Sequence, residues 1–166
     1  MYIIDRKKQI ALINEMKQLR KDSQNCEAYY HHPVTNQMWK SFFPQSDEES
    51  MGPKLLRHEP VPGTIEEQFN ICLTEEAPEN AIGLGIEWTN RADLWPAIMN
   101  VLEQNYSHYS RSQLKLFLKH LTFEEAEIPE HEQEPSQNDA DLSDTMINEL
   151  VWRSRKIRLK RFFVFG

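Results

Sequence analysis

The sequence predicts an α+β fold in a single domain: an antiparallel sheet of about four to five strands, with helices packed on one face. Two observations indicate the sheet, namely aromatic-rich segments on both sides of a Pro/Asn turn and a stretch of strictly alternating apolar residues. Other segments repeat apolar residues at three- and four-residue spacing, which indicates helices. A chain of 166 residues can bury about 70% of its unfolded surface without needing a disulfide or a metal.

The N-terminal part is predicted to begin with an amphipathic helix over residues 5–21. Residues 26–32 and 37–43 are aromatic and flank a turn, so they are predicted to form a β-hairpin. Residues 45–64 are rich in Pro, Gly and acidic side chains, and we interpret them as a loop. A short strand at 55–56 interrupts this loop in our interpretation.

Two further strands are predicted over residues 69–74 and 82–88, because apolar and polar residues alternate there with a period of two. The connection between them is short, so the pair is expected to be antiparallel. Gly83 and Gly85 lie in the second of these segments. We expect them to mark a point where another element approaches the backbone closely.

Two helices follow in the prediction. Residues 93–107 carry an apolar stripe, and Asp93 is expected to be the N-cap. Residues 111–121 carry a second stripe, and Ser110 with Gln113 has the spacing of a capping box. Together with the preceding segments, these helices complete an α+β core that we assign to residues 1–122.

Charge separates by sign in the C-terminal part of the chain. Residues 123–152 contain ten acidic residues and no Lys or Arg, whereas residues 153–161 contain six basic residues. Residues 123–142 are interpreted as a mobile acidic loop, because so polar a stretch cannot bury enough surface to become ordered. Residues 143–166 are expected to return to the same domain as a helix over 143–155 and a basic, aromatic closing strand.

The composition excludes several classes of protein. The formal net charge is −7, which argues against generic binding to anionic membranes or nucleic acid. Two cysteines do not make a disulfide scaffold, and no stretch approaches the roughly 18 apolar residues of a membrane span. The first residues lack the pattern of a signal peptide. We therefore expect a cytoplasmic protein with no membrane partner.

Motifs that carry a reaction are missing from the sequence. The histidines and cysteines lack metal-ligand spacing, no G-x-S-x-G elbow occurs, and the glycines do not form a phosphate loop. We predict no catalytic residue, no metal and no cofactor, and hence a protein that is not an enzyme. The alternative is an enzyme with a dispersed site, for example around Cys72 and either His31 or His32.

The first functional hypothesis is a non-enzymatic binding protein. The profile is similar in style to small acidic bacterial proteins that neutralise a toxin, such as immunity proteins or antitoxins. An acidic surface would promote association with a basic protein partner. The predicted contact residues are Glu124, Glu125, Glu127, Glu130, Glu132 and Glu134, with Asp47, Glu48 and Glu49 as a second group.

The alternative is a nucleic-acid-associated factor, in which a basic segment interleaved with aromatic residues contacts phosphates and bases. The residues that would bind are Arg153, Arg155, Lys156, Arg158, Lys160 and Arg161. A basic run of this kind also protects an edge strand from pairing with another chain. In that second interpretation the basic run is mainly structural.

Overall fold

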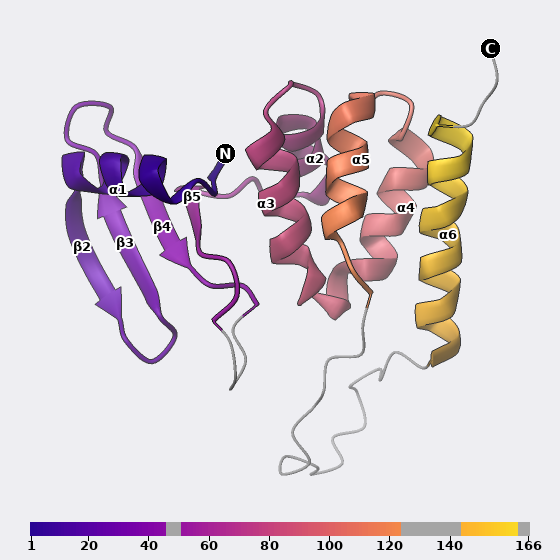
Figure 1. Cartoon of the computed structure of the whole chain (residues 1–166), viewed down its shortest axis with the longest axis horizontal. Coiled ribbons are helices and arrows are strands. Elements are labelled where there is room, and N and C mark those ends of the chain that lie inside the picture. Colours follow the sequence, from indigo (N-terminus) through magenta and orange to yellow (C-terminus); the bar gives the residue numbers. More distant parts are fainter. Residues whose placement is uncertain (46–50, 124–143, 163–166) are drawn as a thin grey trace, which may run out of the picture.

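The computed structural model describes residues 1–45, 51–123 and 144–162, and it confirms the α+β fold with a five-stranded antiparallel sheet (Figure 1). The strands are β1 (Tyr2–Ile3), β2 (Lys17–Asp22), β3 (Glu27–His31), β4 (Met38–Phe42) and β5 (Leu55–Glu59). The helices are α1 (Arg6–Glu15), α2 (Ile65–Leu73), α3 (Pro78–Thr89), α4 (Trp95–Asn105), α5 (Arg111–His120) and α6 (Asp144–Phe162), with a 3₁₀ turn η1 (Ala92–Leu94).

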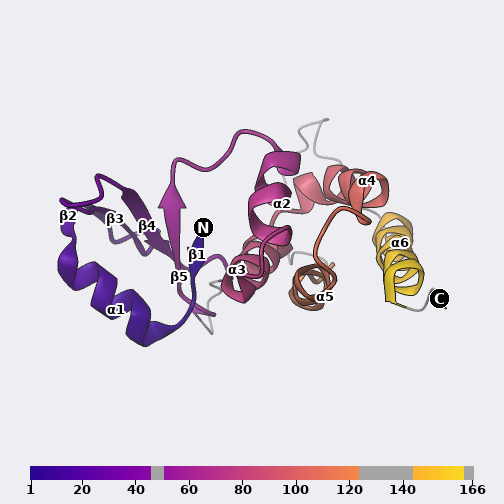
Figure 2. The same cartoon turned by 90° about the horizontal axis from the view of Figure 1, so that it is seen from above.

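The sheet has the strand order β1-β5-β4-β3-β2, and α1 covers one of its faces (Figure 2). The buried residues of that face form a small cluster with the apolar side of α1. They are Ala28, Tyr30, Trp39 and Leu56. Because α1 follows β1 directly and leads into β2, a short connection holds it against this face.

The remaining helices form the second half of the molecule, beyond β1 and β5 (Figures 1 and 2). Leu55 belongs to the helical core, whereas its neighbour Leu56 belongs to the cluster under α1. Successive residues of a strand point to opposite faces, so β5 contributes to both cores. Tyr2 and Phe42 join Leu55 in the helical core and connect the two halves.

Several predicted elements are confirmed. The hairpin over 26–32 and 37–43 is β3–β4, and the strand at 55–56 is the beginning of β5. The helix predicted over 111–121 is α5, and the one predicted over 93–107 is α4 preceded by η1.

The strands predicted over 69–74 and 82–88 are wrong, because these residues lie in α2 and α3. In α2 the buried side chains are Phe69, Cys72 and Leu73, at helical spacing. Almost all of α3 is buried, so its apolar residues show no helical stripe in the sequence.

Helical signals were nevertheless present before each of these helices. Thr64 and Glu67 form a capping box at the start of α2, with Glu67 N–H to Thr64 Oγ1 at 3.1 Å. Pro78 occupies the first turn of α3, where its missing N–H costs nothing. These local signals identify the two helices better than the alternation does.

The two glycines of α3 do mark close approach, as expected, although they lie in a helix. A Cβ built on Gly83 would lie 2.5 Å from the Tyr2 ring. A Cβ on Gly85 would lie 2.9 Å from the carbonyl oxygen of Phe117 in α5. Gly83 therefore lets α3 meet β1, and Gly85 lets it meet α5.

The helix predicted over 5–21 is too long. α1 ends at Glu15, and residues 17–22 form the edge strand β2. This strand pairs only with β3 and exposes Lys17, Arg20 and Lys21, which is the charged edge that discourages pairing with another chain.

The closing strand predicted near the C-terminus is wrong for the described residues, because α6 continues to Phe162. Leu150, Ser154 and Ile157 are buried at spacings of four and three, so this face of α6 packs on the other helices. The apolar residues Ile157 and Leu159 alternate with basic residues as in a strand, but only Ile157 is buried, and Leu159 is 58% exposed on the helix. Residues 124–143, most of the predicted acidic loop, lie outside the described residues.

The predicted caps also differ from the structure. Asp93 lies inside η1 and binds the Arg91 guanidinium, with 2.9 Å between Asp93 Oδ2 and Arg91 NH2. Ser110 precedes α5, but its hydroxyl pairs with Ser112 instead of capping the helix. The Gln113 amide is buried and donates to the carbonyl oxygen of Glu75 at 2.6 Å. Asp93 and Ser110 therefore bind other local partners, and only Gln113 binds a residue distant in the sequence.

Candidate functional site

The acidic residues predicted to bind a partner lie outside the described residues. This holds for the main group, Glu124, Glu125, Glu127, Glu130, Glu132 and Glu134, and for Asp47, Glu48 and Glu49. The acidic-surface hypothesis therefore stays a prediction from the sequence.

The predicted basic residues all lie on α6, and two of them hold α6 in place. The Arg153 guanidinium binds the Glu103 carboxylate of α4 at 2.8 Å and the Asn100 side chain at 2.6 Å. The Arg161 guanidinium donates to the carbonyl oxygen of Tyr109 at 2.9 Å, just before α5. These two cations act mainly in packing.

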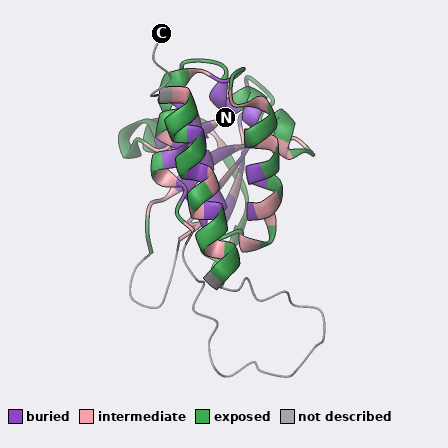
Figure 3. Cartoon of the chain, turned by 90° about the vertical axis from the view of Figure 1, so that its right-hand side faces the viewer, coloured by how far each residue is buried: buried purple, intermediate pink, exposed green. Residues whose placement is uncertain are grey.

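The other four cations of this run, Arg155, Lys156, Arg158 and Lys160, are exposed. Figure 3 views the molecule from the α6 side, where exposed residues cover much of the visible helices. The Arg158 guanidinium donates to the carbonyl oxygen of Leu118 in α5. Burial, and to a lesser extent the positive charge of Arg155, lower the pKa of Arg158.

A second row of cations lies on α5, outside the basic run that the sequence pointed to. Arg111, Lys115 and Lys119 are spaced by four residues, so they form one stripe along the helix. The helix contains no Asp or Glu. That spacing, together with the missing acidic residues, was a signal in the sequence that could have identified the stripe.

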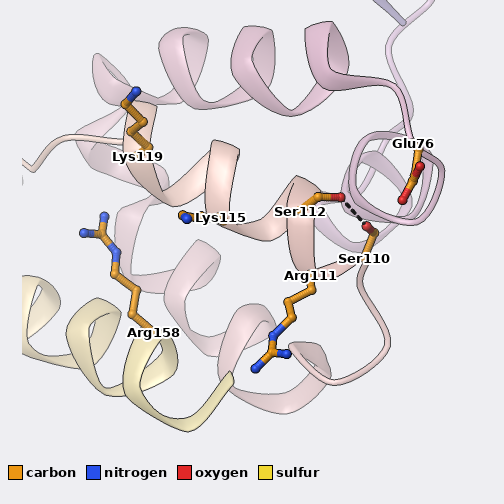
Figure 4. Close-up of a pocket in the computed structure, with 7 residues that line it drawn as sticks. All are labelled: Glu76, Ser110, Arg111, Ser112, Lys115, Lys119 and Arg158. Carbon is orange, nitrogen blue, oxygen red and sulfur yellow. Dashed lines mark hydrogen bonds between the residues drawn. The ribbon is translucent and has the colours of Figure 1, made fainter. Parts of the chain in front are cut away.

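The α5 stripe and Arg158 of α6 line one groove of about 940 Å³ (Figure 4). Lys119 lies toward one end, and Ser110, Ser112 and Glu76 lie at the other. The lining residues are Glu76, Ser110, Arg111, Ser112, Lys115, Lys119 and Arg158. Four of the seven are basic and one is acidic, so the groove attracts anions.

In the described part of the chain, the two lysines and Arg158 of the groove form no ion pair with an acidic side chain. Within residues 1–45, 51–123 and 144–162, no salt bridge involves Lys115, Lys119 or Arg158. The Arg111 guanidinium donates to the carbonyl oxygen of Arg161 at 3.1 Å, which joins α5 to α6. A lysine ammonium group that forms no salt bridge keeps its N–H groups available to donate hydrogen bonds to a ligand.

The helix that carries the stripe is firmly held on its other side. Leu114, Phe117 and Leu118 are at most 1% exposed in the helical core. The Thr89 hydroxyl of α3 donates to the carbonyl oxygen of His120 at 3.1 Å, and Gly85 admits α5 to close contact. The packing of α5 therefore holds the backbone that carries the basic side chains of the groove in a fixed position before a ligand binds.

The structure does not assemble the dispersed site considered around Cys72. Cys72 is fully buried in α2, and burial raises the pKa of its thiol to about 12. His31 and His32 lie at the turn of the β3–β4 hairpin, in the other half of the molecule, where the His31 ring pairs with Asn36 at 2.8 Å. A thiol so buried and so weakly acidic is unsuited to nucleophilic attack.

Metal ligation and membrane crossing find no support in the part of the chain that the structure describes. There, no three His, Cys, Asp or Glu side chains gather closely enough to hold a metal ion. None of the helices in those residues combines the length and apolarity that crossing a bilayer requires.

No family model, curated protein or solved structure matches this chain. Its function must therefore be inferred from the groove and from the residues around it.

Proposed function

We propose that this protein binds a phosphate-rich polyanion in the groove between α5 and α6, and that it acts by binding without catalysing a reaction. The convergence of Arg111, Lys115, Lys119 and Arg158 on one groove supports this proposal. Arginine offers paired donors to phosphate oxygens, and lysine adds a compact positive charge.

The net charge of −7 is compatible with this function because the groove is a local feature. Eight of the acidic residues belong to the segment 124–143, and the described part of α5 and the end of α6 are strongly basic. Opposite charge elsewhere on a protein limits non-specific association, while a focused positive groove retains a specific ligand. Both cysteines are free thiols, which suits the cytoplasmic location that we include in the proposal.

The test is a calorimetric titration of the full chain with inorganic polyphosphate, repeated at several salt concentrations. Wild-type protein should bind, and the affinity should fall steeply with salt because binding releases counterions. The double variant Lys115→Gln/Lys119→Gln should bind roughly tenfold more weakly or worse, since each lost contact involves a charged group.

The matched control is Lys7→Gln/Lys21→Gln, which removes two exposed lysines from α1 and β2. It changes the net charge equally and leaves the groove intact, so its affinity should equal that of wild type. Equal weakening of both double variants would show a general charge effect and contradict the groove as the site.

The hypothesis of an acidic surface that docks a basic protein, in the manner of an immunity protein, stays a second candidate. It is supported by the run of ten acidic residues over 123–152. Neutralising Glu124, Glu125, Glu127, Glu130, Glu132 and Glu134 should slow association with such a partner and reduce its salt dependence. The groove is the stronger candidate because four basic side chains from two helices line it together.

A further inference from the structure

Trp152 is the exception among the tryptophans of this chain. Trp39, Trp88 and Trp95 are 8%, 2% and 1% exposed, whereas Trp152 on α6 is 59% exposed. A tryptophan so open to water leaves much of its ring accessible to a ligand.

Trp152 lies on α6 with two cations, Arg155 and Lys156, one turn toward the C-terminus and with the exposed Glu149 one turn toward the N-terminus. Steps of three residues lead along α6 from Trp152 through Arg155 to Arg158, which lines the groove. Each step turns by about 60° around the helix, so Trp152 lies beside the groove, on the outward side of α6. The Lys156 ammonium lies 5.1 Å from the centre of the Trp152 ring. Phosphate-binding cations therefore adjoin an exposed aromatic face.

We propose, building on the proposed polyanion binding, that the ligand is single-stranded nucleic acid. Its backbone phosphates lie along Lys115, Lys119 and Arg158, and a base stacks on Trp152. A basic groove beside an aromatic platform is how proteins bind single strands with little sequence preference. Stacking needs an unpaired base, so a duplex should bind more weakly.

An acidic protein partner would also match the positive charge, but it fits the surroundings of Trp152 less well. Two other large apolar side chains of α6 are exposed, Met146 (41%) and Leu159 (58%), six and seven residues away from Trp152. The cations Arg155 and Lys156 lie between Trp152 and Leu159 along the helix. Hot spots of protein interfaces are instead enclosed by contacts that exclude water. The pattern of one ring among cations favours a base with phosphates on either side.

The experiment measures binding of the full chain to three labelled probes by fluorescence anisotropy: oligo(dT), oligo(U) and a duplex of mixed sequence. Unlabelled polyphosphate and poly-glutamate serve as competitors. Wild type should bind both single strands more tightly than the duplex. Because the other tryptophans are buried, the unlabelled strand should also quench the Trp152 fluorescence.

Trp152→Ala should weaken single-strand binding roughly 5- to 150-fold, the worth of one stacked base, and leave polyphosphate binding unchanged. The matched control is Leu19→Ala in β2, where an equally exposed apolar side chain (52%) is removed far from the groove. It should bind every probe as wild type does.

The outcomes separate this inference from the proposed function. If polyphosphate binds but Trp152→Ala leaves oligonucleotide affinity unchanged, the single-strand inference is overturned and the groove stands. A preference for poly-glutamate over both single strands would identify an acidic protein as the ligand and overturn the inference as well. If no polyanion binds, both proposals fail.

Discussion

Lys40 and Arg57 in the sheet half and the two lysines of α5 in the helical half differ in what their charges contact. Over the sheet, Lys40 binds Glu27 at 2.6 Å, and Arg57 binds both Glu59 and Glu87. Along α5, Lys115 and Lys119 have no salt bridge within the described residues. Charge stabilises the structure at Lys40 and Arg57, and it is available to a ligand on α5.

The contrast extends to burial. The Arg57 side chain is 11% exposed, and Glu87 links it to Tyr2 through a hydrogen bond of 2.9 Å from the Tyr2 hydroxyl. This network lies where β5 meets α3, between the two halves of the molecule. Its charges need one another because they are largely removed from water. The lysines of α5 are exposed and keep their own hydration until a ligand displaces it.

The largest expected effect comes from Arg57→Met. The substitution leaves Glu59 and Glu87 without their cation in a largely buried place, so it should lower the free energy of unfolding by about 3–5 kcal/mol. Urea denaturation measures this change.

The matched variant on the other half is Arg158→Met. Its side chain is exposed, so removing it should cost about 1 kcal/mol or less while weakening polyphosphate binding. If Arg158→Met destabilises the fold as much as Arg57→Met, the contrast between the two halves is wrong.

A smaller effect is expected for Gly85→Ala, which tests the support of the groove. Alanine normally stabilises a helix relative to glycine by about 1 kcal/mol. Here the new Cβ would lie 2.9 Å from the Phe117 carbonyl oxygen and would push α5 away from α3. We expect a net loss of about 1–3 kcal/mol by thermal or urea unfolding, together with weaker polyanion binding.

Gly63→Ala is the control for this substitution, because no atom lies within 4 Å of the place that a Cβ would occupy there. It should leave both stability and binding unchanged. Stability gained in Gly85→Ala would mean that α3 and α5 are not in tight contact at this position.

The smallest effect concerns the ion pair that joins α6 to α4. Arg153 lowers the pKa of Glu103 below its ordinary value of 4.5. The pair therefore stabilises the fold above pH 4.5, and this contribution is lost as the pH falls through the lower, folded-state pKa. Because the Glu103 side chain is 37% exposed, the gain should be at most about 1 kcal/mol.

Glu103→Gln should remove this contribution, so the difference in unfolding free energy between it and wild type should be present at pH 7 and smaller at a pH well below 4.5, where Glu103 becomes protonated. Denaturation at both pH values measures the difference. A difference that stays constant across this range would show that Glu103 acts through packing rather than through its charge.

Much of the fold was readable from local patterns, and the errors have identifiable causes. The hairpin was predicted from the aromatic residues on both sides of a Pro/Asn turn, and its strands alternate buried with half-buried residues. α4 has one exposed and one buried side, so its periodicity appears in the sequence. α3 is buried nearly all round, and its periodicity is lost. In α1 and β2 the boundary was missed because Ile13, Met16 and Leu19 continue the three-residue spacing of a helix across it.

The candidate site was predicted only in part. The basic run of α6 was visible, but the sequence could not show that Arg153 and Arg161 bind other helices while Arg158 faces a groove. The stripe on α5 was overlooked because its lysines are dispersed among the apolar residues of an amphipathic helix.

The sequence by itself determined the fold class, the elements with one buried side, and the location of the positive charge along α6. Only the tertiary structure decided which cations face a ligand, because that depends on the packing of α5 beside α6. Residues 40 to 50 positions apart along the chain, such as Leu118 and Arg158, become neighbours through that packing. No local sequence pattern shows that these residues are neighbours in space, because their proximity depends on the packing of both helices against a common core.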